Sequence, residues 1–138
     1  MHRAHLAEET KIFEHIAPLS RAAGTVNSAA AVNALASSQE YFEDSMIVIH
    51  VGAATGTPDS FSLVVKLQEG ATSTPATDVS GKTITITAAG VYSFGFAPGE
   101  RLQYRDVNAV LTFVNGTTPA IPYGVVEVAT KAKKYPQA

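Results

Sequence analysis

The sequence contains no cysteine and no tryptophan, and only 16% of its residues are charged. The absence of cysteine excludes disulfides, thiolate metal sites and cysteine nucleophiles. A typical globular domain carries about 25% charged residues, so part of this surface is expected to be covered by a partner. The formal net charge of −2 provides no field that would gather a polyanion. We therefore predict no direct nucleic-acid partner.

Long apolar runs are also missing. The longest lies around MIVIHVGAA (residues 46–54), and it is shorter than the roughly 20 residues that a helix needs to cross a bilayer. The N-terminal stretch MHRAHLAEETKIFEHI has mixed charges and no apolar core of the length of a signal peptide. The chain is therefore expected to be made in a cytoplasm and to have no membrane partner.

A chain of 138 residues is long enough for one domain with its own core. From Ser45 onward the sequence shows successive β patterns. The segments MIVIHVGA, FSLVVKLQE, KTITITA, GVYSFGFAP and IPYGVVEVA are apolar or alternate with a period of two, and turn signals such as Asn115-Gly116 separate them. About seven or eight strands without intervening helices predict an all-β fold, an antiparallel β-sandwich or jelly roll over residues 25–130.

Residues 25–44 are rich in alanine, serine and asparagine, and their apolar positions show little order. A short strand over 25–35 and a helix near 29–36 both remain open for this segment.

Residues 1–24 differ in composition from the rest of the chain. Leu6, Ile12, Phe13 and Ile16 form a loose helical stripe, which Pro18 and the following glycine would end. Such a short helix is marginal alone, so we expect an N-terminal arm or short helix that docks on another surface. Residues 131–138 form a basic tail with Lys131, Lys133, Lys134 and Tyr135.

The segment RLQYRDVNAVLTF (residues 101–113) contains a break in its alternation. Leu102 and Tyr104 share one face, whereas from Val107 onward the apolar residues fall on odd numbers. We predict a β-bulge or a corner at Asp106. Arg101 and Arg105 then lie on one polar strip, which suits a carboxylate-bearing partner or a sugar, or is the ordinary wet face of a sheet.

No constellation of residues predicts catalysis, a metal or a cofactor. His2 and His5 lack a third ligand at a suitable spacing, and His50 lies in an apolar strand without the ligand pattern of jelly-roll metal enzymes. The pairs Glu8-Glu9 and Glu43-Asp44 are sequence neighbours rather than carboxylates that face each other. No serine lies in a G-x-S-x-G turn. We therefore expect a protein that is not an enzyme.

The run from MIVIHVGAATGTPDSFSLVVKLQEG through GVYSFGFAPGERLQYRDVNAVLTFVNG to PYGVVEVA resembles small virion proteins of tailed bacteriophages, most of all the jelly-roll capsid cement or decoration proteins. The resemblance covers roughly residues 24–130 and is a pattern of strands. It implies a protein on the outer capsid surface that binds an HK97-like shell across junctions between major capsid protein subunits. It carries no catalytic residues.

In this role the partners would be the major capsid protein and a second copy of this chain, with a two-fold dimer as the default symmetry. The candidate contacts to the capsid or to a second copy are Leu6, Ile12, Phe13, Ile16, Arg101, Arg105, Lys131, Lys133, Lys134 and Tyr135. The alternative is a carbohydrate- or host-surface-binding β-sandwich of a phage head or tail. Tyr92, Tyr104 and Tyr123 are its candidate platforms for stacking sugars, and at least one of them is expected in the core.

Overall fold

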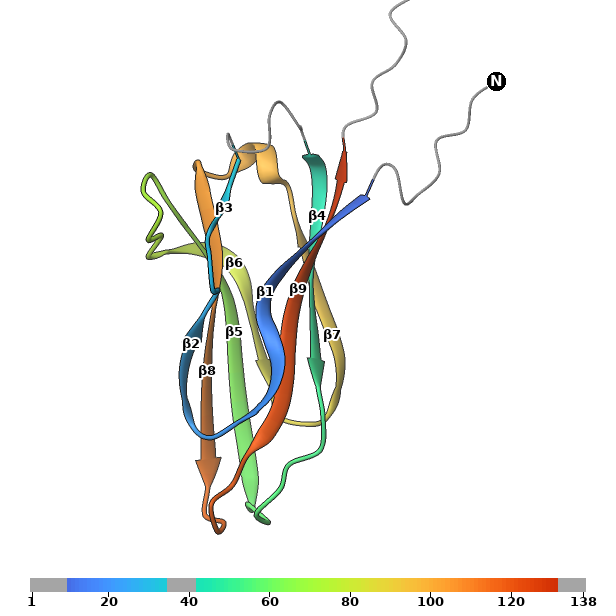
Figure 1. Cartoon of the computed structure of the whole chain (residues 1–138), viewed down its shortest axis with the longest axis vertical. Coiled ribbons are helices and arrows are strands. Elements are labelled where there is room, and N and C mark those ends of the chain that lie inside the picture. The colour runs from blue at the N-terminus through green and yellow to red at the C-terminus, as the bar shows by residue number, and fades with distance from the viewer. Residues whose placement is uncertain (1–9, 35–41, 132–138) are drawn as a thin grey trace, which may run out of the picture.

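Two antiparallel β-sheets form a sandwich in the computed structural model, which describes residues 10–34 and 42–131 (Figure 1). One sheet has the strand order β1-β9-β4-β7, and the other has the order β2-β8-β5-β6 with the short β3 paired to β8. The strands are β1 Thr10–Arg21, β2 Gly24–Asn27, β3 Val32–Asn33, β4 Phe42–Val51, β5 Ser60–Gly70, β6 Thr77–Ile86, β7 Gly90–Phe96, β8 Tyr104–Val114 and β9 Ile121–Lys131.

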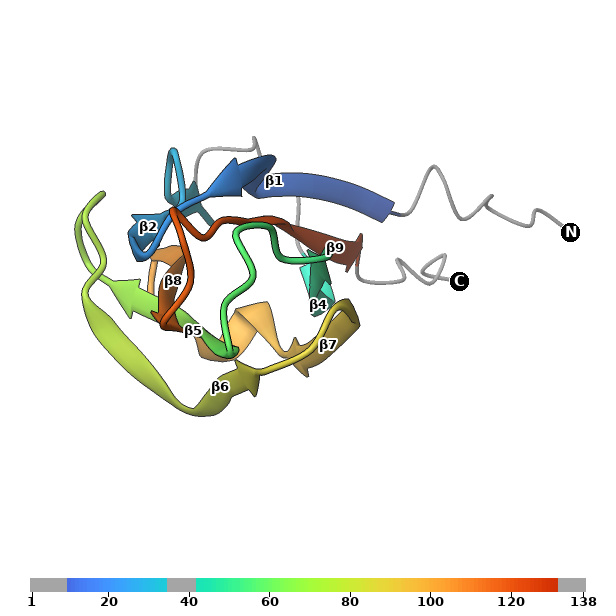
Figure 2. The same ribbon diagram turned by 90° about the horizontal axis from the view of Figure 1, so that it is seen from below.

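This strand order is that of a jelly roll, in which most connections cross from one sheet to the other. As a result β1 pairs with β9, and β2 pairs with β8, although these strands are far apart in sequence. Viewed along the sandwich, the two sheets enclose a common interior (Figure 2). The predicted all-β jelly-roll sandwich is confirmed.

The core consists of alternate residues from both sheets, because successive side chains of a strand point to opposite faces. The four-stranded sheet contributes Ile47, Ile49, Val51, Ile121, Tyr123 and Val125, and the other sheet contributes Leu63, Val65, Leu67, Ile86, Val107, Ala109 and Leu111. All of these side chains are buried. The strands predicted from Ser45 onward are present, and the alternating apolar residues of β5 and the end of β6 point inward.

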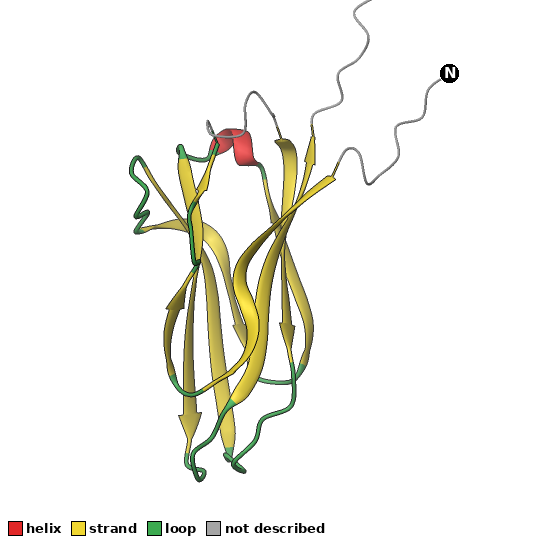
Figure 3. Cartoon of the chain, in the orientation of Figure 1, coloured by secondary structure: helices red, strands yellow, loops and turns green. Residues whose placement is uncertain are grey.

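The expected N-terminal helix is wrong for residues 10–21, which form the edge strand β1 of the sandwich (Figure 3). The pairing of β1 with β9 shifts between Glu14 and Ile16 and again between Ile16 and Leu19. These two irregularities break the alternation, so the apolar residues fall at spacings that resemble a helical stripe. The sandwich therefore begins at Thr10 and not at residue 25, and the proposed arm is left with residues 1–9, which lie outside the described residues.

The predicted bulge at Asp106 is also wrong. Strand β8 pairs with β5 in one continuous register, from Tyr104 opposite Gly70 to Val114 opposite Ser60. Arg105 points inward, as Val107 does. The strand starts at Tyr104, after the 3-10 turn η1 (Pro98–Glu100). The break in the pattern is a charged residue at a core position, not an extra residue in the strand.

The ambiguous segment after residue 24 forms β2 and β3 and no helix over its described part, residues 25–34. The polar loop between β5 and β6 is short, because β6 already begins at Thr77. Asp78 accepts hydrogen bonds there from Lys66 and Gln68 of β5, which extends the hairpin toward its loop.

Candidate functional site

The outer face of the four-stranded sheet is apolar across three strands. Ile12 of β1 lies opposite Val128 of β9, which lies opposite Met46 of β4, and all three side chains face away from the core. The next outward row brings Val126 of β9 opposite Val48 of β4. On β7, the edge strand of this sheet, Val91 lies opposite His50 of β4.

These side chains are open to solvent to different degrees. Ile12 is 65% exposed and Val91 is 66% exposed, whereas Val48, Val126 and Val128 are half-buried by their neighbours. A shallow hollow of about 220 Å³, lined in part by Pro18, Val48 and His50, interrupts the face. We call the set Ile12, Met46, Val48, Val91, Val126 and Val128 the apolar outer face.

The outer face of the other sheet is polar in comparison. One outward row runs from Asn27 through Asn108 and Lys66 to Thr83, and a second polar row, which lies beyond Val64 and Val110, pairs Ser62 with Thr112. Val64 and Val110 are apolar exceptions in the middle of this face. An antiparallel sheet commonly leaves one face to water, and here that face belongs to the sheet β2-β8-β5-β6. Of the two outer faces, the apolar outer face is therefore the one whose burial against a partner would be the more favourable in free energy.

The interior contains a charged cluster that joins the two sheets. Arg105 of β8 donates from Nε to Oε1 of Glu127 on β9 (3.0 Å) and from Nη2 to Oε2 (2.7 Å). The Ser45 hydroxyl donates to Oε2 (2.8 Å), and His15 Nε2 lies 3.0 Å from Oε1. His15 Nδ1 in turn lies 2.8 Å from the Ser28 hydroxyl, which accepts the backbone N–H of Val107.

The cluster follows from the local backbone. The irregularity after Glu14 turns His15 and Ile16 inward together, so that the imidazole reaches Glu127. The Arg105 guanidinium also lies over the rings of Phe13 and Phe96, with centroids at 5.8 and 5.6 Å. All of these partners are supplied from within the chain, so the cluster serves to hold the sheets together and offers no open position to a ligand.

The Glu127 carboxyl group remains ionised below its usual pKa of 4.5. Burial alone would raise its pKa, but the hydrogen bonds from His15 and Arg105 and their charges outweigh burial and lower the pKa from 4.5 to about 2. A carboxyl group whose pKa is depressed on folding stabilises the folded state above its unfolded pKa. This contribution is present above pH 4.5 and is lost as the pH falls toward 2.

We therefore expect the free energy of unfolding to fall between pH 4.5 and pH 2, partly through proton uptake by Glu127. Urea denaturation at several pH values in this range measures the decline. The double variant R105M/E127L, which replaces the ion pair by apolar side chains, should lose less stability over the same range. An identical decline in both proteins would contradict the role assigned to Glu127.

The candidate contact residues have different positions in the structure. Ile12 is exposed on the apolar outer face, whereas Ile16 lies in the core and Phe13 packs edge-to-face on Phe42 at 5.8 Å. Arg105 is 1% exposed, so neither it nor Ile16 is available to a partner, and these two assignments are corrected.

Arg101 is separate from Arg105 and lies 3.5 Å from Glu69 in a partly exposed pair. The polar strip expected to contain both arginines therefore does not exist. Lys131 ends β9, while Leu6, Lys133, Lys134 and Tyr135 lie outside the described residues.

The three candidate tyrosines, all of which lie in the described part of the chain, do not form a sugar-stacking platform. Tyr123 is buried in the core, as expected for at least one of the three. Tyr92 points inward from β7, and its hydroxyl group donates a hydrogen bond to the Ala88 carbonyl oxygen (2.7 Å). Tyr104 is half-buried beside Asn33.

Sequence reasoning missed His15, Ser45 and Glu127 as members of one cluster. Glu127 stands at an inward position between Val125 and Ala129, as Arg105 does before Val107. Two opposite charges at inward positions of two strands are the signal that could have predicted their pairing. His15 had no such signal, because its orientation depends on the irregularity in β1.

In the described part of the chain, no helix is long and apolar enough to cross a membrane. No family model matches the sequence. No curated protein matches it either.

Several solved structures have a similar fold. The Tobacco streak virus coat protein is 13% identical, and the match covers 97% of this chain and 95% of the coat protein chain, with a TM-score of 0.42. A chain of the T13 IBDV viral particle is 12% identical, with coverages of 93% and 33% and a TM-score of 0.49. The CBM36-1 domain of a multidomain xylanase from the hindgut metagenome of Trinervitermes trinervoides is 8% identical, with coverages of 90% and 99% and a TM-score of 0.43. Likenesses this distant carry no argument about function.

Proposed function

We propose that this protein is a virion structural protein that binds the outside of an HK97-like capsid and cements neighbouring major capsid protein subunits. The observation that carries the proposal is the apolar outer face of one sheet, opposite a polar face on the other sheet. Jelly rolls are a common architecture of viral capsid proteins, and the strand pattern of the sequence resembles phage cement proteins.

The apolar outer face is the surface through which the protein would pack on the shell. Burying its exposed side chains would contribute roughly 25 cal/mol per Å² of apolar area removed from water. The charged cluster keeps the two sheets in fixed relation, so that the face is presented as a rigid surface. Self-association into a two-fold dimer would let two such faces bind neighbouring subunits together, which increases the total affinity through effective concentration.

A density gradient of a lysate that contains assembled particles tests this function, with the protein quantified by mass spectrometry across the fractions. We expect it to sediment with full heads in an amount comparable to the major capsid protein. A trace amount in the same fractions would indicate a vertex, tail or fibre component instead. Recovery only at the top of the gradient, with the unassembled proteins, would contradict the virion assignment.

The alternative, a carbohydrate- or host-surface-binding module, has no observation in its favour. Sugar-binding surfaces usually offer open aromatic faces, whereas Tyr123 is buried and Tyr92 and Tyr104 are partly buried.

A further inference from the structure

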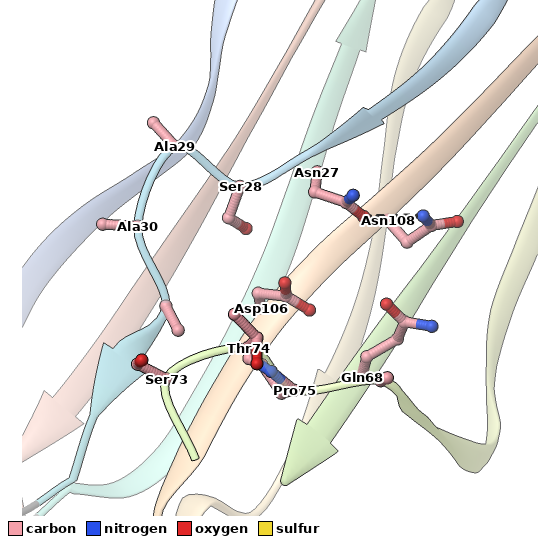
Figure 4. Close-up of a pocket in the computed structure, with 12 residues that line it drawn as sticks. Asn27, Ser28, Ala29, Ala30, Gln68, Ser73, Thr74, Pro75, Asp106 and Asn108 are labelled. Atoms are coloured by element: carbon pink, nitrogen blue, oxygen red, sulfur yellow. Dashed lines mark hydrogen bonds between the residues drawn. The ribbon is translucent and has the colours of Figure 1, made fainter.

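A polar hollow on the outer face of the other sheet contains a buried carboxylate without a partner (Figure 4). Asp106 points outward from β8, yet it is only 7% exposed. Two segments cover it, the loop after β5 with Ser73, Thr74 and Pro75, and the connection from β2 to β3. We call this hollow of about 450 Å³ the Asp106 pocket.

The Asp106 carboxylate receives no hydrogen bond from the described part of the chain. Its Oδ1 is buried and has no partner. Burial raises the pKa of the Asp106 carboxyl group, and the charge of His15 opposes the rise. A buried carboxylate oxygen without a donor is costly, and native structures usually satisfy such a group with a protein donor, an ordered water or an ion.

The side-chain amide and ammonium groups near Asp106 donate hydrogen bonds to residues other than Asp106. The Asn108 amide group donates to Asn27 Oδ1 (2.7 Å), and the Gln68 amide group donates to Asp78 Oδ1 (2.8 Å). Lys66 also donates to Asp78, at 3.0 Å. The Gln68 side-chain oxygen is on the side of its amide nearer Asp106 (Figure 4). The pocket therefore presents the negative charge of Asp106 with the Gln68 oxygen and the Ser73 and Thr74 hydroxyls as acceptors near it.

A carboxylate with an unpaired oxygen and further acceptors beside it suits a donor-rich cation. A lysine ammonium group carries three donors and an arginine guanidinium group carries five, and neither has an acceptor. A calcium ion usually takes six to eight oxygen ligands with several carboxylates, and among the described residues Asp106 is the only carboxylate that lines the pocket. Among the described residues there is also no group of three or more histidines, cysteines or acidic residues able to hold a metal.

We propose that the Asp106 pocket binds an organic cation, an alkylammonium or guanidinium group, with Asp106 as its counter-ion and the Gln68 oxygen and the Ser73 and Thr74 hydroxyls as further acceptors. The pocket lies on the sheet opposite the apolar outer face, so this site is independent of the proposed capsid contact. The volume is within the range of about 300–1,000 Å³ that is usual for ligand pockets.

NMR titration of the isotope-labelled full chain tests the proposal, with the side-chain carboxyl carbon of Asp106 as the reporter. The probes are blocked lysine and blocked arginine, which represent protein side chains, and putrescine, which represents a free amine. We expect a saturable shift at Asp106 and at the amides of Gln68 and Asn108, with a lower pKa for the Asp106 carboxyl group in the bound state. Tighter binding of the blocked amino acids than of putrescine would assign the source to a protein partner, and the reverse order to a free amine.

The variant D106N keeps the shape of the side chain and removes its charge, so binding should weaken at least about tenfold. The matched variant D44N changes an exposed aspartate on β4 in the same way and should bind as the unchanged protein does. Three results would overturn the proposal: no saturable shift with any of the cations, equal binding by D106N, or a preference for calcium or for a neutral sugar.

Discussion

Replacing Arg105 with alanine is expected to lower the free energy of unfolding by about 3–5 kcal/mol. The substitution leaves Glu127, which is fully buried, without its bidentate partner. It also removes the guanidinium group from between the rings of Phe13 and Phe96. Chemical denaturation at neutral pH, followed by far-UV circular dichroism, measures the effect.

The matched control is R101A. Arg101 forms a partly exposed pair with Glu69 at 3.5 Å, and such pairs contribute about 0–1 kcal/mol. The double variant R105M/E127L should recover a large part of the stability lost in R105A, because apolar replacement of a buried ion pair is often neutral or stabilising. Equal losses in R105A and R101A would contradict the structural role of the cluster.

Introducing a lysine at Val48 is expected to reduce the amount of protein bound to assembled heads by at least about tenfold, since docking would bury an unpaired charge. Val48 lies near the middle of the apolar outer face, opposite Val126 of β9 and Ser93 of β7. Gradient sedimentation with quantification of bound protein is the measurement. The protein itself should stay folded, because this side chain is directed away from the core.

V64K provides the control on the other sheet. Val64 is also half-buried, faces outward and lies on a strand with a neighbour on each side, Val110 of β8 and Thr85 of β6. We expect V64K to bind heads as the unchanged protein does. If V64K lost binding to heads and V48K kept it, the docking surface would lie on the polar sheet. If both variants kept binding, the apolar outer face would have no part in the proposed function.

The strands from Ser45 onward were predictable because alternation with a period of two is a local property of the sequence. Phe61, Leu63 and Val65 mark the inward phase of β5 directly, and the Asn115-Gly116 turn marks the end of β8. Strand β1 was missed for an equally local reason. The irregularity between Glu14 and Ile16 puts two residues at a helical spacing on opposite faces, and only pairing with β9 shows that Ile12 faces outward while Ile16 faces the core.

The candidate site was less accessible to sequence reasoning. Ile12 was predicted as a contact and is exposed, but Met46, Val48 and Val126 were read only as parts of strands. They become one surface because β9 lies between β1 and β4, an order that follows from the jelly-roll connections. The sequence predicts a surface position for Arg105 because a buried charge is rare, and its partner Glu127 is 22 residues away.

The sequence by itself determined the class of fold, the positions of most strands and the absence of thiol chemistry. These depend on composition and on the alternation of neighbouring residues. Tertiary structure alone decided which strands are neighbours, which of two faces is apolar, and that Arg105 and His15 meet Glu127 in the interior. It also decided that Asp106, an outward residue, is covered by a loop from a different strand. The physical reason is that a side chain's burial and charge partners depend on segments distant in sequence, which local patterns do not encode.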